Sequence, residues 1–212
     1  REPDRLYVPL DQQERLTPYI GFETPRVHRL GGTVWITTKR KAREEAEKLA
    51  KELLELYTKR HVARREPWQG DPFLEQILRD NFHFEETKDQ LRAEQEILQD
   101  LEQSDKPMDR VLCGDVGFGK TEIALRAAFR VIASGRQVAL LAPTTILAAQ
   151  HEKTFRARFH NLPVSIRMLS RLMSGREQKK ILQELKQGKI DCLIGTHRIL
   201  SKDVEFKNLG MI

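Results

Sequence analysis

The feature that most constrains the fold is a glycine-rich segment at residues 114–121. It reads Gly-Asp-Val-Gly-Phe-Gly-Lys-Thr and fits the phosphate-loop pattern G-x-x-x-x-G-K-[ST]. In such a loop the backbone N–H groups converge on phosphate oxygens, the lysine reaches the β- and γ-phosphates, and the hydroxyl residue ligates Mg²⁺. The alternative is a glycine-rich turn that binds nothing. The residues assigned to phosphate are Gly114, Gly117, Gly119, Lys120 and Thr121, with Lys120 and Thr121 in the catalytic role and Thr121 as the Mg²⁺ ligand.

A phosphate loop requires a strand before it and a helix after it, and the flanking sequence supplies both. From residue 108 onward apolar runs alternate with helical patterns. Gly135 and Gly188 fall where glycines commonly end helices. This alternation predicts an α/β domain with a parallel sheet covered on both faces. The predicted strands are 110–113, 137–142, 164–169 and 191–195, and the predicted helices are 120–134, 145–159 and 174–187.

The chain before residue 67 has a different pattern of expected secondary structure. Residues 5–10 suggest a strand, 11–16 a short helix, and 27–30 a brief segment ended by two glycines. A long helix is predicted over 34–63, because apolar residues recur there every three or four positions. Its interpretation stays open between a solvated helix lying on a domain and a mechanical connector between two domains. Further helices are predicted over 72–79 and 88–101, with Asp71 and Thr87 as N-caps.

Thr87 and Gln90, about thirty residues before Lys120, form a T-x-x-Q pattern that follows two aromatic residues. A glutamine side chain offers one acceptor and one donor, which match the adenine N6 amine and N7. A nearby ring, Phe84 or Phe82, can stack on the base. The alternative is an ordinary threonine N-cap. Upstream of a phosphate loop the pattern favours adenine recognition, and therefore ATP.

Polar residues also follow three of the predicted strands. In open α/β sheets ligands bind outside the carboxyl ends of the strands, and helix-start N–H groups suit phosphate contacts. Each segment taken alone is equally typical of an N-cap or a turn, but all would project from one edge of the sheet. We read His197 as a loop or DNA-facing residue and not as a catalytic base. The DNA-facing candidates are Thr144, Thr145, Ser170, Arg171, Thr196 and His197.

Composition limits the class of protein. The net charge of +6 is compatible with a nucleic-acid partner without requiring one. The two cysteines, Cys113 and Cys192, each end an apolar run, so we expect two buried thiols and a reducing, cytoplasmic location. No apolar stretch approaches the length of a membrane span, and no signal-peptide pattern is present.

Together, residues 114–121, 143–148 and 195–198 resemble the superfamily-two helicases and translocases. Residues 82–90 match the adenine-recognition segment of two bacterial members, the transcription-repair coupling factors and the RecG branched-DNA helicases. The leading segment around 6–10, Gly31-Gly32, Trp35 and the long helix resemble the coupling factors and not RecG, which has an OB-type module before its motor. The resemblance covers nearly the whole chain.

The resemblance implies three parts. Residues 1–32 would be the C-terminal part of an RNA-polymerase-interacting domain, 33–66 a relay helix, and 67–212 a first RecA-like motor domain. The implied activity is ATP-driven translocation on double-stranded DNA that displaces stalled RNA polymerase and couples transcription to repair. Nucleotide-excision-repair proteins would bind through regions outside this chain. A RecG-like branched-DNA helicase is the alternative.

The chain also departs from the family pattern. The strands that open the polymerase-interacting domain, the acidic Asp-Glu segment expected shortly after Gly210, and the second motor domain are not in the sequence. Without these carboxylates no group orients the attacking water. We therefore expect a fragment cut at both ends that turns over no ATP alone. The remaining alternative is a non-catalytic polymerase-binding fragment with half a nucleotide site.

Overall fold

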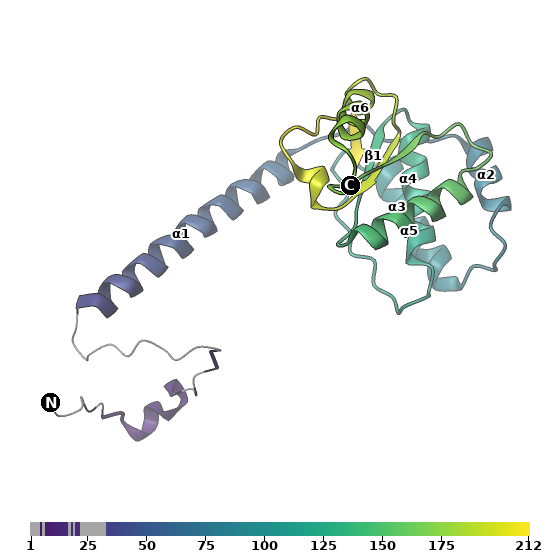
Figure 1. Cartoon of the computed structure of the whole chain (residues 1–212). Helices are drawn as coiled ribbons and strands as arrows, with labels where there is room; N and C mark the ends of the chain where they lie inside the picture. The colour runs from purple at the N-terminus through teal and green to yellow at the C-terminus, as the bar shows by residue number, and fades with distance from the viewer. Residues whose placement is uncertain (1–4, 6, 17, 19, 22–32) are drawn as a thin grey trace. The chain divides into compact units, whose positions relative to one another are not determined.

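A computed structural model describes residues 5, 7–16, 18, 20–21 and 33–212, which divide into two compact units, Arg1–Val62 and Ala63–Ile212 (Figure 1). The first unit contains a short 3-10 helix, η1 (Leu10–Arg15), and the helix α1 (Thr33–Val62). The predicted long helix is confirmed within one residue at each end. The predicted segment 27–30 lies outside the described residues.

The strand predicted over residues 5–10 is wrong for the residues that the structure describes. Residues 7–9 have no regular structure, and Leu10 already begins η1. Pro9 precedes η1 with φ −58° and ψ 146° and has no N–H to donate to a ladder. Its fixed φ therefore suits the start of a helical turn better than the interior of a sheet.

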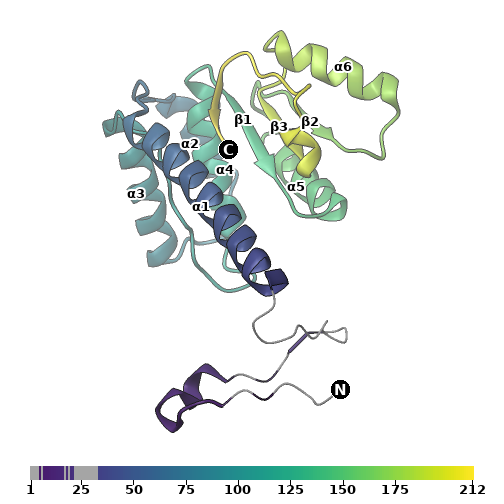
Figure 2. The ribbon, with the colours of Figure 1, turned by 90° about the vertical axis from the view of Figure 1, so that its left-hand side faces the viewer.

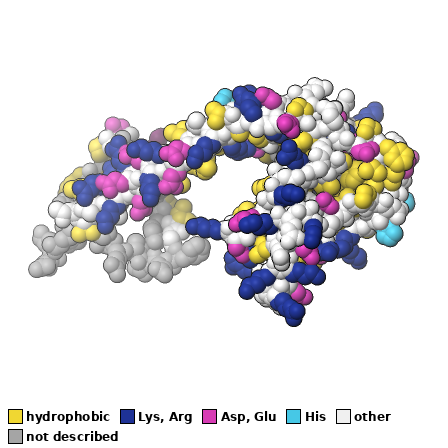
Figure 3. All heavy atoms as spheres, turned by 90° about the horizontal axis from the view of Figure 1, so that it is seen from above, with side chains coloured by type: hydrophobic (Ala, Val, Ile, Leu, Met, Phe, Trp, Pro, Cys, Tyr) yellow, Lys and Arg dark blue, Asp and Glu magenta, His cyan; other side chains and the backbone are white. Residues whose placement is uncertain are grey.

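Helix α1 is solvated along its length. Its described side chains are exposed, including Leu53 at 46% and Tyr57 at 66%. Pairs four residues apart, such as Arg43 and Glu47 at 2.9 Å, support it locally. Figure 3 shows acidic and basic side chains interspersed along it. Among the described residues, no helix is both long and apolar enough to cross a lipid bilayer.

The second unit is an α/β domain with a parallel four-stranded sheet in the order β2-β3-β1-β4 (Figure 2). The predicted α/β fold with a parallel sheet and flanking helices is therefore confirmed. The positive φ of Gly135 and Gly188 confirms them as the residues that end helices. The elements are α2 (Pro72–Asp80), α3 (Lys88–Gln103), α4 (Lys120–Ala133), β1 (Gln137–Leu141), α5 (Thr145–Arg158), β2 (Ile166–Leu169), α6 (Gly175–Lys186), β3 (Cys192–Gly195), η2 (His197–Leu200) and β4 (Leu209–Met211).

The sheet separates two hydrophobic clusters, because alternate strand residues point to opposite faces. Val138, Cys192 and Ile166 face the larger cluster, which contains residues of α2, α3, α4 and α5. Ala139 and Leu193 face the smaller cluster, which contains residues of α6 and η2. The register pairs Val138 with Cys192 and Ala139 with Leu193, so the two faces stay aligned from strand to strand. This packing fixes the carboxyl ends of β1, β2 and β3 at one edge.

The strand predicted at residues 110–113 is not formed. The segment before the phosphate loop has no regular structure, and Val111 is 89% exposed. Only Leu112 and Met108 pack against the larger cluster. Pro107 and Met108, which precede residues 110–113, line a cavity of about 250 Å³ together with residues of β4. Residues 110–113 themselves pair with none of the four strands. Cys113 is consequently exposed, and the prediction that both cysteines are buried is wrong for this one.

The fourth strand, β4, is held by a buried glutamine at the start of β1. The Gln137 side chain is 3% exposed, and its Oε1 accepts hydrogen bonds from the backbone N–H groups of Lys207 and Asn208 at 2.8 and 3.2 Å. Its Nε2 donates to the carbonyls of Leu185 and Ile190 at 3.0 and 2.7 Å. One buried amide therefore joins the end of α6 and the residue two positions before β3 to the segment that leads into β4.

Candidate functional site

The glycine-rich segment forms a loop at the N-terminus of α4. Gly117 and Gly119 have φ values of +86° and +70°, a region that residues with a Cβ rarely adopt. The Lys120 ammonium folds back into the loop and donates to the carbonyls of Gly114 and Asp115, both at 2.6 Å. Thr121 follows in the first turn of α4. The first N–H groups of a helix have no intrahelical partner, so they and the Lys120 cation face the loop together.

Helix α4 fixes the loop to the core. Leu125, Phe129 and Val131 on this helix are at most 1% exposed. Their burial in the larger cluster makes α4 a rigid base, whereas residues 113–118 of the loop are exposed. The loop therefore lies at the surface, on the most deeply buried helix of the domain.

A cavity of about 310 Å³ lies against the loop, and residues from α3, the 110–115 segment and α4 line it. This volume falls at the lower end of the range for small-molecule sites. The lining is mixed, with apolar Ala93 and Ile123 beside polar Gln90 and Lys120. The full lining is Thr87, Asp89, Gln90, Ala93, Leu112, Cys113, Gly114, Asp115, Phe118, Lys120 and Ile123.

Thr87 and Gln90 connect α3 to the phosphate loop. The Thr87 hydroxyl accepts from the Gln90 N–H at 3.2 Å, and Gln90 Oε1 accepts from the Thr87 N–H at 2.9 Å, which makes a capping box. The Thr87 N-cap is therefore confirmed. Gln90 Nε2 also donates to the Phe118 carbonyl at 3.0 Å. Gln90 thus has a structural partner at both ends of its amide, and its contact with adenine stays a prediction.

The two aromatic candidates for base stacking differ in exposure. Phe84 is 75% exposed, whereas Phe82 is half-buried. Their ring centroids are 5.5 Å apart and the rings are tilted by 59°. Phe84 is therefore the more accessible ring; neither ring is among the residues that line the cavity at the loop, and stacking on a base stays a prediction.

A second hollow lies at the carboxyl ends of three neighbouring strands. It has a volume of about 570 Å³ and is lined by Pro143, Thr144, Thr145, Arg171, Thr196 and His197. These residues follow β1, β2 and β3 respectively, so the parallel sheet brings together segments that are distant in sequence. Five of the six DNA-facing candidates therefore line one groove, which we call the strand-end groove. Arg171 and His197 are exposed in it.

Two hydroxyl candidates in this region already have local partners. Ser170 is 2% exposed, and its Oγ accepts from the Leu172 N–H at 3.2 Å, so its side chain does not line the groove. The Thr144 Oγ1 accepts from the Leu147 N–H at 3.2 Å and caps α5. The ordinary N-cap that the sequence also allowed is therefore present at Thr144. Arg171 is therefore the residue after β2 whose side chain lines the groove.

The sequence did not reveal a group of buried charges beneath the aromatic pair. Arg126 on α4 is 5% exposed and bonds Glu86 at 2.9 Å, Glu94 at 2.8 Å and Glu122 at 3.0 Å. Burial lowers the pKa of Arg126, but the hydrogen bonds that it donates to Glu86 and Glu122 and the charge of Glu94 leave its pKa raised overall. The Arg126 hydrogen bond in turn lowers the pKa of Glu86. The only sequence signal was a charged residue on the buried face of a predicted helix.

No group of three or more His, Cys, Asp or Glu side chains within the described residues is arranged to hold a metal ion. Thr121 lies in the first turn of α4, and its role as a Mg²⁺ ligand stays a prediction.

This loop and sheet define a class of protein. Residues 87–212 match the model of the DEAD/DEAH box helicase family, and the chain belongs to that family. The structure of RecG bound to a three-way DNA junction matches with a TM-score of 0.68 and 36% identity, over 74% of this chain and 21% of that one. The fold is therefore that of a RecA-like helicase domain.

More specific relatives are similar over the whole chain. The transcription-repair-coupling factor of Bacillus subtilis (strain 168) is 44% identical over 99% of this chain. That of Borreliella burgdorferi is 45% identical over 100% of it. The chain spans 18% and 19% of the lengths of these two relatives. The similarity thus includes residues 1–86, which precede the family match.

Proposed function

We propose that this chain is the nucleotide-binding part of an ATP-driven motor that moves on double-stranded DNA. The observation that carries the proposal is the phosphate loop itself. Its Lys120 ammonium bonds two loop carbonyls at the start of α4, against a cavity that Gln90 also lines. The loop N–H groups and Lys120 would hold the β- and γ-phosphates, Thr121 would ligate Mg²⁺, and Phe84 with Gln90 would contact adenine.

Binding of a fluorescent ATP analogue to the chain, with and without Mg²⁺, tests this site. We expect saturable binding that Lys120→Ala weakens at least tenfold, which corresponds to about 1.4 kcal/mol. Lys180→Ala is the matched control, because Lys180 is an exposed lysine on α6, on the other face of the sheet. Equal affinity in the Lys120→Ala and Lys180→Ala variants would refute the nucleotide site.

The strand-end groove is the proposed contact with the DNA backbone. Its threonines and the exposed Arg171 and His197 suit phosphate oxygens, which helix-start N–H groups also bind. We expect Arg171→Ala to weaken binding of duplex DNA. The slope of the logarithm of the binding constant against the logarithm of salt concentration should fall in magnitude by about one, since one fewer counterion is released. Lys189→Ala is the control, because Lys189 is exposed just before β3, at the opposite edge of the sheet. Fluorescence anisotropy at several salt concentrations measures DNA binding by the Arg171→Ala and Lys189→Ala variants. An equal salt dependence in both variants would contradict the proposed contact.

For the whole protein we propose an activity on stalled RNA polymerase that couples transcription to DNA repair in the cytoplasm. The support is the name of the relatives called transcription-repair-coupling factors and their similarity to nearly the whole of this chain. Residues 1–32 would bind the polymerase, residues 33–66 would relay to the motor of residues 67–212, and repair proteins would bind elsewhere. A pull-down should recover RNA polymerase with the chain and equally with its Lys120→Ala variant. Loss of polymerase with that variant would refute the separation of roles.

A RecG-like activity on branched DNA is the second candidate, favoured by the similarity to RecG bound to a three-way junction. The two candidates predict different ligands. A coupling-factor activity requires polymerase binding and no preference for junctions over linear duplex. Tighter binding of a three-way junction by the chain, without polymerase capture, would favour the RecG-like activity.

A further inference from the structure

The half-buried Phe82 lies against two neighbouring guanidinium groups. The Cζ atoms of Arg126 and Arg158 lie 5.0 and 5.2 Å from its ring centroid, both within cation–π range. Phe82 also contacts the exposed Phe84. The position of Phe84 therefore depends on a ring that two arginines of α4 and α5 fix in place.

Arg126 also holds the other end of the same short segment. Its Nη2 donates to Glu86 Oε1 at 2.9 Å, and Glu86 directly precedes the capping box of Thr87 and Gln90. Phe82 and Glu86 thus contact one guanidinium, and Phe84 lies between them in sequence. We call residues 82–87 the aromatic segment.

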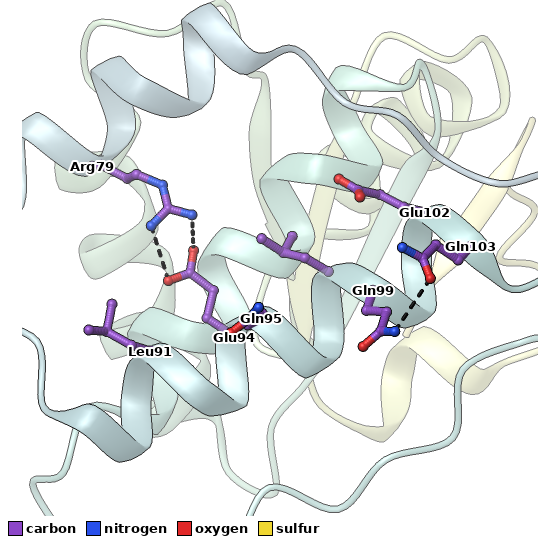
Figure 4. A pocket seen from close by; sticks show the side chains of 8 residues that line it. Arg79, Leu91, Glu94, Gln95, Gln99, Glu102 and Gln103 are labelled. Carbon is purple, nitrogen blue, oxygen red and sulfur yellow. Dashed lines mark hydrogen bonds and ion pairs between the residues drawn. The ribbon is translucent and has the colours of Figure 1, made fainter.

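The remaining donors of Arg126 bond one carboxylate of α3 and one of α4. Nη1 donates to Glu94 at 2.8 Å and Nε to Glu122 at 3.0 Å. Figure 4 shows the Glu94 carboxylate on α3 facing the guanidinium of Arg79 from α2, an ion pair of 2.7 Å. Glu122 is also paired with Arg158, at 2.6 Å. Because Glu94 and Glu122 are each held by a second arginine, the guanidinium of Arg126 has little freedom to move relative to α4.

Arg126 is six residues after Lys120 on the same buried helix. A shift of Arg126 relative to the phosphate loop would therefore require α4 to deform. We propose that Arg126 is a positioning residue that sets the aromatic segment at a fixed distance from the phosphate loop, so that base and triphosphate are recognised by one rigid unit. This inference rests on the proposed nucleotide site and adds to it a residue that selects for the base.

The test removes the Glu86 anchor, because Arg126 itself is buried among carboxylates and its replacement endangers folding. The matched control is Glu102→Ala. Glu86 and Glu102 side chains are 29% and 35% exposed, and each is paired with a buried arginine of α4, Arg126 and Arg130 respectively. The carboxylate partners of Arg130 are Glu75 and Glu102, which both lie outside the aromatic segment.

Affinities for ATP, GTP and inorganic tripolyphosphate are measured by competition against a fluorescent ATP analogue, on the full chain. In Glu86→Ala we expect ATP affinity to fall about tenfold, the equivalent of about 1.4 kcal/mol, and the preference for ATP over GTP to fall with it. Tripolyphosphate affinity should not change, since the phosphate loop is untouched. Glu102→Ala should leave all three affinities as in the unaltered chain.

Three outcomes overturn the inference. The first is an unchanged ATP-to-GTP preference in Glu86→Ala. The second is an equal loss of tripolyphosphate affinity, which would indicate general damage to the domain. The third is the same loss in Glu102→Ala. Absence of ATP binding by the unaltered chain would instead refute the proposed function, and this inference with it. Thermal unfolding of both variants identifies any that fail to fold, and Glu86→Gln then replaces Glu86→Ala with the same expected pattern.

Discussion

The contact between Gln90 and the phosphate loop can be measured through the glycine beside it. A Cβ added at Gly119 would lie 2.5 Å from Gln90 Nε2, the atom that donates to the Phe118 carbonyl. A Cβ at Gly117 would meet nothing within 4 Å. Both glycines have positive φ, at +70° and +86°. Gly119→Ala and Gly117→Ala therefore share a backbone cost and differ in the glutamine contact.

The magnitudes follow from these contacts. Left-handed backbone at a residue with a Cβ costs roughly 1–2 kcal/mol, which applies to both variants. The Nε2 atom is the far end of a flexible side chain, so the overlap in Gly119→Ala is relieved by rotation of Gln90. The additional cost is then the lost hydrogen bond to Phe118, about 1 kcal/mol. We expect Gly119→Ala to destabilise the domain by about 1 kcal/mol more than Gly117→Ala does.

Urea unfolding followed by circular dichroism measures the free energies of unfolding. A double-mutant cycle with Gln90→Ala completes the assay, because Gly119→Ala should then cost no more than Gly117→Ala. Equal destabilisation by the two glycine variants in the unaltered background would refute the reasoning. So would an extra cost of Gly119→Ala that persists after Gln90 is removed.

Two further predictions concern the cysteines and the strand-end groove. A thiol reagent should label exposed Cys113 in the folded chain and Cys192 only after unfolding, because Cys192 is fully buried and burial raises its pKa to about 12. Equal labelling of Cys113 and Cys192 in the folded chain, measured by mass spectrometry, would contradict this prediction. ATP should slow the labelling of Cys113, because this residue lines the cavity at the loop. Gly195→Ala should destabilise the domain by about 1–3 kcal/mol, since its Cβ would lie 2.3 Å from the Leu169 carbonyl of the neighbouring strand. Gly175→Ala, with open space around it, is the control in the same unfolding assay, and an equal effect would refute the clash.

Local patterns predicted the helices and three strands well. Asp71 caps α2 by accepting from the Phe73 and Leu74 N–H groups, as the Asp-Pro pair indicated. The strands β1, β2 and β3 agree with the predicted runs to within two residues at each end. These elements follow from side-chain period, capping residues and glycine positions, which are all properties of neighbouring residues.

The failures were at segments whose structure depends on a distant partner. Residues 110–113 have the composition of a buried strand, but a strand needs a ladder, and these residues pair with none of the four strands. Ser170 has a polar side chain at a strand end, yet its environment buries it. Neither outcome is encoded by the residues next to it in the sequence.

The sequence by itself determined the phosphate loop, because glycines at positive φ, a lysine and a helix start lie within eight consecutive positions. It also placed polar residues at the ends of three strands. Only the tertiary structure decided that these ends form one groove, since the strand order β2-β3-β1-β4 differs from the chain order. Only it joined Arg126 to Glu86, forty residues apart, through a guanidinium whose burial demands partners from several helices. Local backbone geometry depends on neighbouring residues in the sequence, whereas the partners of a buried charge depend on how distant segments pack together.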